Sequence, residues 1–331
     1  MDPLTHAVTG ALVAQSLAPE EHRFALALMG AGAGMVSDID FVARKAPARL
    51  LFLKLHRGLT HSFLALPAIG ACAAGCGVLL FDTPFWSTLA ITALAALSHL
   101  VLDSIIHTTG IQWLWPWRRR FRVPLLLGLN PLTSSARCAE RSLLVCLRCS
   151  MHSAVLSPMV LLLWTGFLVS LALPPWRLAS QLTLGVATLY VGLCWVMRQR
   201  ARGLLPSAGV FPAGFSPFSW LGVSRSDKGG FIVRATSPLS GRVDELHRYG
   251  PSEEGADVER GQGTETVSQL LETAVFPHVS RNGSILVWRD LAYAFSPSVS
   301  LFAARVELDG ERVVREEFRE RWDRQPEARE G

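Results

Sequence analysis

The chain has 331 residues, of which 50% are hydrophobic and only 18% are charged, and its formal net charge is +5. Soluble domains carry about 25% charged residues, so this composition excludes a disordered chain, a coiled coil and an ordinary cytosolic enzyme. The six cysteines are too few and too scattered for a disulfide scaffold.

The first 37 residues predict a short helical hairpin. Residues 3–19 are uncharged apart from His6, residues 24–37 are uncharged, and a polar turn at 19–22 separates them. The second stretch has 14 residues. A helix of that length rises about 21 Å, whereas the hydrocarbon core of a bilayer is about 30 Å thick. We therefore expect the hairpin to cross a thinned membrane or only to dip into it.

Four longer uncharged stretches predict membrane-spanning helices. They cover residues 63–81, 83–102, 153–176 and 178–197, and each is close to the roughly 20 apolar residues that a span needs. The expected fold is therefore mainly α, a polytopic helical membrane bundle built from the short N-terminal hairpin and four long spans.

Basic residues predict how this bundle is oriented. The segments 42–60, 118–148 and 198–202 carry fifteen lysines and arginines, whereas the opposite turns carry only Arg23 and Arg177. Because Lys and Arg accumulate in cytoplasmic loops, the richer side is predicted to face the cytoplasm. The chain is thus expected to be a multi-pass protein of a bacterial inner membrane, with its C-terminal domain in the cytoplasm.

From residue 204 onward the sequence predicts a small, mostly β domain. Prolines and glycines at 206–217 form a linker, and strand-like runs follow at 230–235, 285–287, 300–307 and 311–317. Asp309-Gly310 separates the last two runs, which is a strong hairpin signal. The polar, acidic stretch 252–269 is expected to be a loop, with a short helix near 267–274. The predicted domains are residues 1–203 in the membrane and 204–331 in the cytoplasm, where the second could cover a site or bind a protein partner.

Histidines and aspartates gather at one end of the predicted bundle. His6 begins the first hairpin helix, and Asp38 and Asp40 end the second, so an antiparallel hairpin brings them together. His56 and His61 precede the first long span. The next span runs back toward the same end, and in its last turns lie His99 and Asp103, which as i and i+4 project from one helix face.

Imidazole and carboxylate groups are the ligands of Zn²⁺ and also of Mn²⁺ or Fe²⁺. A divalent cation is expected here, zinc first, with manganese, iron or magnesium as alternatives. Each residue also has a purely structural interpretation: His6 as a polar cap, Asp38 and Asp40 as helix terminators, and His56 as an interfacial histidine. His99 and Asp103 could likewise be a polar pair that joins two helices. The coincidence of all these groups at one end favours the metal site.

The motifs that carry these residues resemble a known series. They are Thr5-His6, Ser37-Asp38-Ile39-Asp40, His56-Arg57-Gly58-Leu59-Thr60-His61-Ser62, and His99 with Asp103-Ser104. Together they resemble the bacterial inner-membrane-bound metal-dependent hydrolase family, some members of which are induced by DNA damage. The resemblance is strongest over residues 1–117. Asn130-Pro131 departs from it, because an acidic residue is expected before that proline.

The resemblance implies a metal site and metal-assisted hydrolysis. The metal-site residues that it implies are His6, Asp38, Asp40, His56, His61, His99 and Asp103. Because seven candidate ligands exceed one tetrahedral site, two ions about 3.5–4 Å apart would suit them. Asp38 or Asp40 could instead act as a general base. Arg57 could bind an anionic group of the substrate, or it could contact lipid headgroups.

A site at the headgroup level favours an amphiphilic ester or phosphoester as substrate, with membrane lipids as partners. One alternative is a transporter for metal ions or protons that uses the same residues as a relay, although transporter sites usually lie near the bilayer midplane. Another is a non-catalytic membrane stress protein whose metal site is only structural, which predicts a closed ligand shell.

Two further sequence signals are weaker evidence of function. A cluster of soft ligands, Cys138, Cys146, Cys149 and His152, contains one CxxC pair and could hold zinc, but a single pair is a weak signal. Three consecutive arginines at 118–120 follow Trp113, Trp115 and Trp117. In that setting they indicate an interfacial anchor rather than a nucleic-acid surface.

Overall fold

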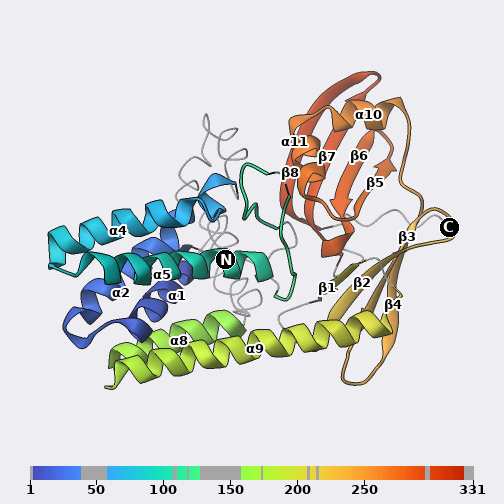
Figure 1. Ribbon diagram of the computed structural model, residues 1–331. Helices are drawn as coiled ribbons and strands as arrows, with labels where there is room; N and C mark the ends of the chain where they lie inside the picture. The colour runs from blue at the N-terminus through green and yellow to red at the C-terminus, as the bar shows by residue number, and fades with distance from the viewer. Residues whose placement is uncertain are drawn as a thin grey trace, which may run out of the picture. The chain divides into compact units, whose positions relative to one another are not determined.

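The computed structural model divides the chain into two units, Met1–Leu193 and Cys194–Gly331. It describes residues 3–38, 58–106, 110–117, 119–126, 158–172, 174–206, 209–213, 216–294 and 299–323. The first unit is helical and the second holds β-sheets (Figure 1).

The helical unit is built from apolar helices joined in pairs. Two short 3-10 turns, η1 at Glu20–His22 and η3 at Leu59–His61, lie between the helices. The helices are α1 at Pro3–Leu17, α2 at Arg23–Val36, α4 at Ala65–Phe81, α5 at Phe85–Ile106, α8 at Pro158–Ala172 and α9 at Trp176–Leu204, which continues into the second unit.

Helices α1 and α2 form a hairpin whose closest contacts are made by glycines. Pro3 opens α1 at a position where its missing N–H costs nothing. A Cβ on Gly34 would lie 2.5 Å from the carbonyl oxygen of His6, and a Cβ on Gly10 would meet the carbonyl oxygen of Gly30. Because no side chain fits between them, these glycines let the two backbones touch and fix where His6 lies against the end of α2.

Helices α4 and α5 form a second hairpin around a tight turn. Asp82 ends α4 in the left-handed conformation with φ of 52°, and its N–H donates to the carbonyl of Val78 at 3.2 Å. The Thr88 hydroxyl then donates to Thr83 Oγ1 at 2.9 Å, and a Cβ on Gly77 would meet both threonines. The turn thereby aims α5 back toward the end of the unit where α4 begins.

Helices α8 and α9 are held against α1 by polar contacts. The buried Gln15 side chain accepts hydrogen bonds from Ser170 at 2.9 Å and Ser180 at 3.0 Å. Arg177 and Gln181 donate to the carbonyl of Ser16 at 3.1 and 3.0 Å. Polar groups with few competing partners in an apolar surrounding hold helices together in this way.

The expectation of four long spans is wrong. Among the described residues, two helices are long and apolar enough to cross a membrane, Phe85–Ile105 and Trp176–Leu204. Helix α4 has only 17 residues, which is about 26 Å, because Phe63 and Leu64 lie in a turn before it. Helix α8 has 15 residues, and the predicted start of its span, 153–157, lies outside the described residues.

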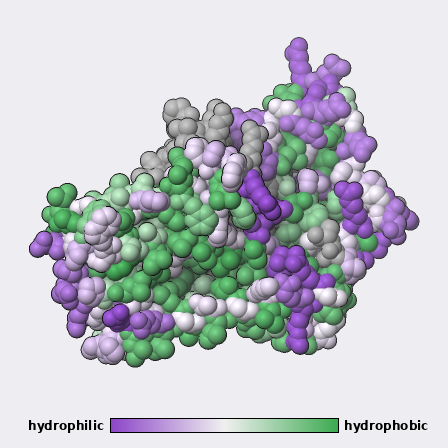
Figure 2. Space-filling view, in the orientation of Figure 1, coloured by the Kyte–Doolittle hydropathy of each residue, from purple (hydrophilic) through white to green (hydrophobic). Residues whose placement is uncertain are grey.

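The surface of the helical unit is strongly apolar. Leu79 is 85% exposed, Trp86 77% and Leu189 75%, and Figure 2 shows hydrophobic residues gathered over these helices. Monomeric soluble proteins rarely expose large contiguous apolar patches, so this surface is suited to contact with lipid.

The second unit holds two four-stranded antiparallel sheets. The first has the order β1-β2-β3-β4 and the second β5-β6-β7-β8. Helix α10 at Ala256–Gln262 and helix α11 at Glu265–Thr273 lie between them in sequence. The strands are β1 at Gly209–Pro212, β2 at Trp220–Arg225, β3 at Phe231–Thr236, β4 at Val243–Tyr249, β5 at Pro277–Asn282, β6 at Ile285–Asp290, β7 at Val299–Asp309 and β8 at Arg312–Asp323.

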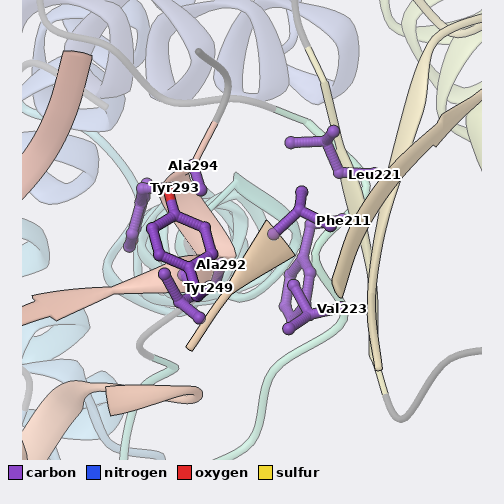
Figure 3. Close-up of a cluster of buried hydrophobic side chains, with 9 residues drawn as sticks. Phe211, Leu221, Val223, Tyr249, Ala292, Tyr293 and Ala294 are labelled. Atoms are coloured by element: carbon purple, nitrogen blue, oxygen red, sulfur yellow. The ribbon is translucent and has the colours of Figure 1, made fainter. Parts of the chain in front are cut away.

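Two hydrophobic cores stabilise this unit. One packs Phe211, Leu221 and Val223 of the first sheet against the segment Leu291–Tyr293 that follows β6, as Figure 3 shows for Tyr293 and its neighbours. The other packs α10 and α11 on the second sheet around the fully buried Trp288 indole. Gly261 of α10 leaves room for that indole, which a Cβ there would strike.

The expectation of one small, mostly β domain is therefore also wrong. The region is larger than expected, because β1, β2, β4 and β5 add strands that sequence runs did not reveal. It is also more mixed, because part of the expected acidic loop 252–269 is α10. Burial against Trp288 favours this helix, and its local sequence carries no trace of that contact.

Candidate metal centre

Five of the seven predicted metal-site residues come together in the helical unit, and all five are buried. His6 lies in the first turn of α1, and Asp38 follows the end of α2. His61 ends the η3 turn, and His99 and Asp103 lie on α5. The other predicted residues, Asp40, His56 and Arg57, lie outside the described residues, as do Cys138, Cys146, Cys149 and His152.

Four of the side chains each bring one ligand atom to the same place. One atom each from Asp38, His61, His99 and Asp103 lies within 4.8 Å of the others; we call these residues the four-ligand cluster. The two histidine Nε2 atoms are 3.1 Å apart. Nε2 of His61 lies 3.5 Å from both Asp38 Oδ1 and Asp103 Oδ2. Nε2 of His99 lies 3.7 and 3.6 Å from the same two oxygens.

These spacings fit a tetrahedral cation. Ligand atoms about 2.0–2.2 Å from a zinc ion at tetrahedral angles lie about 3.3–3.6 Å from one another. Five of the six spacings in the cluster are 3.1 to 3.7 Å and bracket that range, and all four atoms lie within 4.8 Å of one another. Two imidazoles and two carboxylates are also a donor set that Zn²⁺, Mn²⁺ and Fe²⁺ accept. The residues present therefore fit a divalent cation.

The protonation of His99 is fixed by the backbone of α2. Its Nδ1 lies 2.7 Å from the carbonyl oxygen of Gly34. A carbonyl can only accept, so Nδ1 carries the proton and donates it. Nε2 then offers its lone pair to the cluster, which is the tautomer a metal ligand needs. His61 has an equivalent outer contact, because the Thr60 hydroxyl lies 3.0 Å from its Nδ1.

The two carboxylates place negative charge beside the histidines, and this charge shifts the pKa of His61. Burial lowers the pKa of the His61 imidazole, but Asp103 and Asp38 together outweigh burial and raise that pKa to about 9. His61 is therefore protonated at neutral pH when nothing else neutralises the carboxylates. The same negative charge attracts a divalent cation, which would take the place of that proton.

His6 lies beside the four-ligand cluster. Its ring stacks on His99 with centroids 3.7 Å apart, and its Nε2 lies 3.2 Å from Oδ1 of Asp103. Among the residues that the structure describes, neither ring nitrogen of His6 has a hydrogen-bond partner, although the residue is only 1% exposed. Within the same residues, Oδ2 of Asp38 and the hydroxyl of Ser37 are buried and also without a partner.

Sequence reasoning missed the residues that hold the ligands in place. Gly34 supplies both the close contact to His6 and the carbonyl for His99. The Gly30-x-x-x-Gly34 spacing, typical of close helix packing in membranes, could have revealed it. Ser104, next to Asp103, accepts from the Trp113 indole at 2.6 Å, and Trp113 was predicted only as an interfacial anchor.

Residues 110–117 and 119–126 fold against the site. The Phe63 N–H donates to the Trp113 carbonyl at 2.9 Å, and the Val123 N–H donates to the Ser104 carbonyl at 2.9 Å. Ile111 pairs with Phe121 in an antiparallel bridge. The segment thus connects the end of α5 to the residues that follow His61.

One comparison with known proteins gives a result. The model of the family described as YdjM inner membrane protein matches residues 1–201 of the chain, well over half of its 331 residues. The matched range contains all of the four-ligand cluster and His6. The comparisons with curated proteins and with solved structures found no match.

Proposed function

Because the chain belongs to the YdjM inner membrane protein family, we propose that it is a membrane-bound hydrolase that uses a divalent metal ion. One observation carries the proposal, the convergence of four buried ligand atoms within 4.8 Å of one another. Zinc is the ion that a tetrahedral set of imidazole and carboxylate ligands favours.

The chain's own residues would divide the work. Asp38 and Asp103 supply the negative charge that holds a cation, and His61 and His99 supply neutral nitrogen ligands. Gly34 and Thr60 orient those two imidazoles from outside. A divalent ion held here would polarise an ester or phosphoryl oxygen and activate water at neutral pH.

An amphiphilic ester or phosphoester is the substrate class that the surroundings support. Two residues beyond His61, Phe63 is 39% exposed and Leu64 is 61% exposed. On the adjoining segment 110–126, Trp117 is 69% exposed and Arg119 follows it two residues later. Apolar side chains beside the guanidinium of an arginine such as Arg119 suit a lipid-like molecule with an anionic group.

We also propose that the protein crosses the inner membrane more than once and carries the residues after α9 on the cytoplasmic side. The support is the excess of lysine and arginine in the segments 42–60, 118–148 and 198–202. Cysteine labelling from each side of the membrane, at single positions in the turn 19–22 and in β4, tests this orientation.

The proposal is tested by measuring metal content and turnover in the same samples. Purified protein should contain a divalent metal and hydrolyse phosphodiester or acyl-ester lipids, and chelation should abolish the turnover. His61→Ala should lose both the metal and the activity. His22→Ala, which changes a histidine at the α1–α2 turn, is the matched control and should keep both. Full turnover by His61→Ala would reject the enzyme.

A structural metal site is the second candidate, and one observation favours it. Each member of the four-ligand cluster is at most 6% exposed, and four protein ligands can saturate a tetrahedral ion, as in structural sites. This candidate expects tight metal binding and a large loss of thermal stability on chelation, with no hydrolysis of any lipid tested.

A further inference from the structure

We propose that the second unit binds a small amphipathic anion, a molecule with an apolar ring or chain that carries a carboxylate or phosphate group. The binding place is a pocket of about 610 Å³ that is lined by the end of β2, the start of β3 and the segment leading into β5. Its described lining residues all belong to the second unit. The inference is therefore independent of the metal centre and of the function proposed for it.

The pocket has the size and the apolar lining of a ligand site. Pockets that hold small molecules measure about 300–1,000 Å³ and are lined mostly by apolar side chains. Here Phe231, Val275, Phe276 and Pro277 supply the apolar wall. The two phenylalanines are only half-buried, so the pocket reaches the surface. A ligand can cover aromatic rings that the fold leaves partly in water.

The wall formed by the segment leading into β5 is held in place before any ligand binds. The buried carboxylate of Asp290 accepts hydrogen bonds from the N–H groups of Val275 and Phe276, at 2.9 and 3.0 Å. The ring of Phe276 also makes an edge contact with the ring of Phe231, with centroids 6.3 Å apart. A preformed wall loses little conformational freedom when a ligand binds, and this favours affinity.

The charge of the lining indicates an anion. Arg225 is the single charged residue among the described lining residues, and its side chain is exposed. Within the described part of the chain its guanidinium forms no ion pair and no hydrogen bond, whereas the neighbouring Ser224 hydroxyl already accepts from Arg234 at 2.9 Å. A guanidinium presents a planar set of donors that matches a carboxylate or a phosphate. The free donors of Arg225 beside an apolar wall therefore fit a molecule with an anionic head and an apolar body.

Calorimetric titration tests the proposal on the full-length chain in lipid nanodiscs, with empty nanodiscs as the blank. The anionic probes are 2-naphthoate and hexyl phosphonate, and their uncharged counterparts are 2-naphthamide and hexanol. We expect the wild type to bind about one anion per chain, at least about tenfold more tightly than the uncharged counterpart. Tighter binding of hexyl phosphonate would identify a lipid-derived ligand, and tighter binding of 2-naphthoate a soluble aromatic acid; either order supports the pocket.

Two variants locate the binding. Arg225→Gln should weaken the binding of both anions about tenfold or more and leave that of 2-naphthamide unchanged. Lys228→Gln removes the same charge from the turn between β2 and β3, outside the described lining, and should keep the wild-type affinity. Circular dichroism of each variant checks that it is folded.

Three results would overturn the pocket. They are equal affinities of the wild type and Arg225→Gln for the anions, no heat above the blank for the wild type, and loss of binding when the wild type is treated with chelator. The last result would assign the anions to the metal centre instead. The first two results leave the proposed hydrolase intact, because its test depends on metal content and turnover.

Discussion

The Nε2 atoms of His61 and His99 lie 3.1 Å apart, at a place where only one of them can hold a proton. His99 has already placed its proton on Nδ1, facing Gly34, so its Nε2 can only accept. The pair therefore needs either a proton on His61 or a cation between the two nitrogens. The chemistry of the whole site follows from this alternative.

Metal affinity is predicted to rise with pH. The pKa of His61 is raised to about 9 by Asp103 and Asp38, so cation binding at neutral pH must displace a proton. Each displaced proton changes the affinity about tenfold per pH unit, so between about pH 6.5 and 9 the dissociation constant should fall as pH rises. Competition with a chromophoric chelator measures it, and an affinity independent of pH would contradict the predicted protonation.

In the metal-free protein, the same raised pKa makes the folded state less stable as the pH rises. A folded-state pKa above the unfolded value of about 6.5 contributes stability that is complete below that pH. This contribution is lost as the pH rises through about 9. Chelator-treated protein should therefore melt at a lower temperature at pH 9 than at pH 6.5, whereas His61→Ala should show a smaller change between these two pH values.

Gly34→Ala is predicted to weaken metal binding without touching a ligand. The added methyl group would lie 2.5 Å from the carbonyl oxygen of His6, so α1 and α2 must separate and the hydrogen bond to His99 must shift. Loss of such an outer contact typically lowers metal affinity by about 10–100-fold. Gly32→Ala is the matched control, since no atom lies within 4 Å of its added Cβ. Equal affinities for the two variants would refute the role of Gly34.

Gln15→Leu is predicted to loosen α8 and α9 from α1. It removes the acceptor shared by Ser170 and Ser180, but both hydroxyls keep a carbonyl of their own helix. The loss should therefore be small, about 1 kcal/mol. Thr188→Ala, whose exposed hydroxyl bonds only within α9, is the control. Thermal unfolding should separate the two variants, while metal content stays at the wild-type value in both.

Asp257 is predicted to link α10 to the second sheet in a pH-dependent way. Arg281 on β5 and Arg260 on α10 bind this carboxylate and lower its pKa. A lowered carboxyl pKa contributes stability above about pH 4, which is lost as the pH falls further. Hydrogen exchange of α10 and β5, corrected for the intrinsic rate, should accelerate at acid pH in the wild type. In Asp257→Asn the exchange should be fast already at neutral pH, and Asp227→Asn is the control.

The convergence of the ligands could be predicted because it follows from helix periodicity. His99 and Asp103 are four residues apart on one helix, and antiparallel pairing of α1 with α2 brings His6 to the end of α2, beside Gly34. The span lengths could not be predicted. Hydropathy reads Phe63 and Leu64 as helix, whereas the Ser62 hydroxyl bonds back to the Leu59 carbonyl at 2.7 Å and delays the start of α4.

The second unit was harder for a different reason. Strands β1 and β2 contain glycine, proline and polar residues, and although they pair with each other locally, as Phe211 does with Leu221, they pack against Leu291 and Tyr293 far along the chain. Helix α10 lies in an acidic stretch and is stabilised by Trp288 from β6. Local patterns do not contain such contacts, so these elements become visible only when the chain is folded.

The ligands come from both ends of a long stretch of chain, and this has a consequence for biogenesis. Asp103 emerges from the ribosome 97 residues after His6, so the proposed ion-binding centre stays incomplete until α5 has been made and has packed against α1 and α2. Ion loading would then register that α1, α2, α4 and α5 have come together. In a cell short of the ion, the N-terminal helices of newly made chains would not be held together. We expect membrane quality-control proteases to degrade such chains.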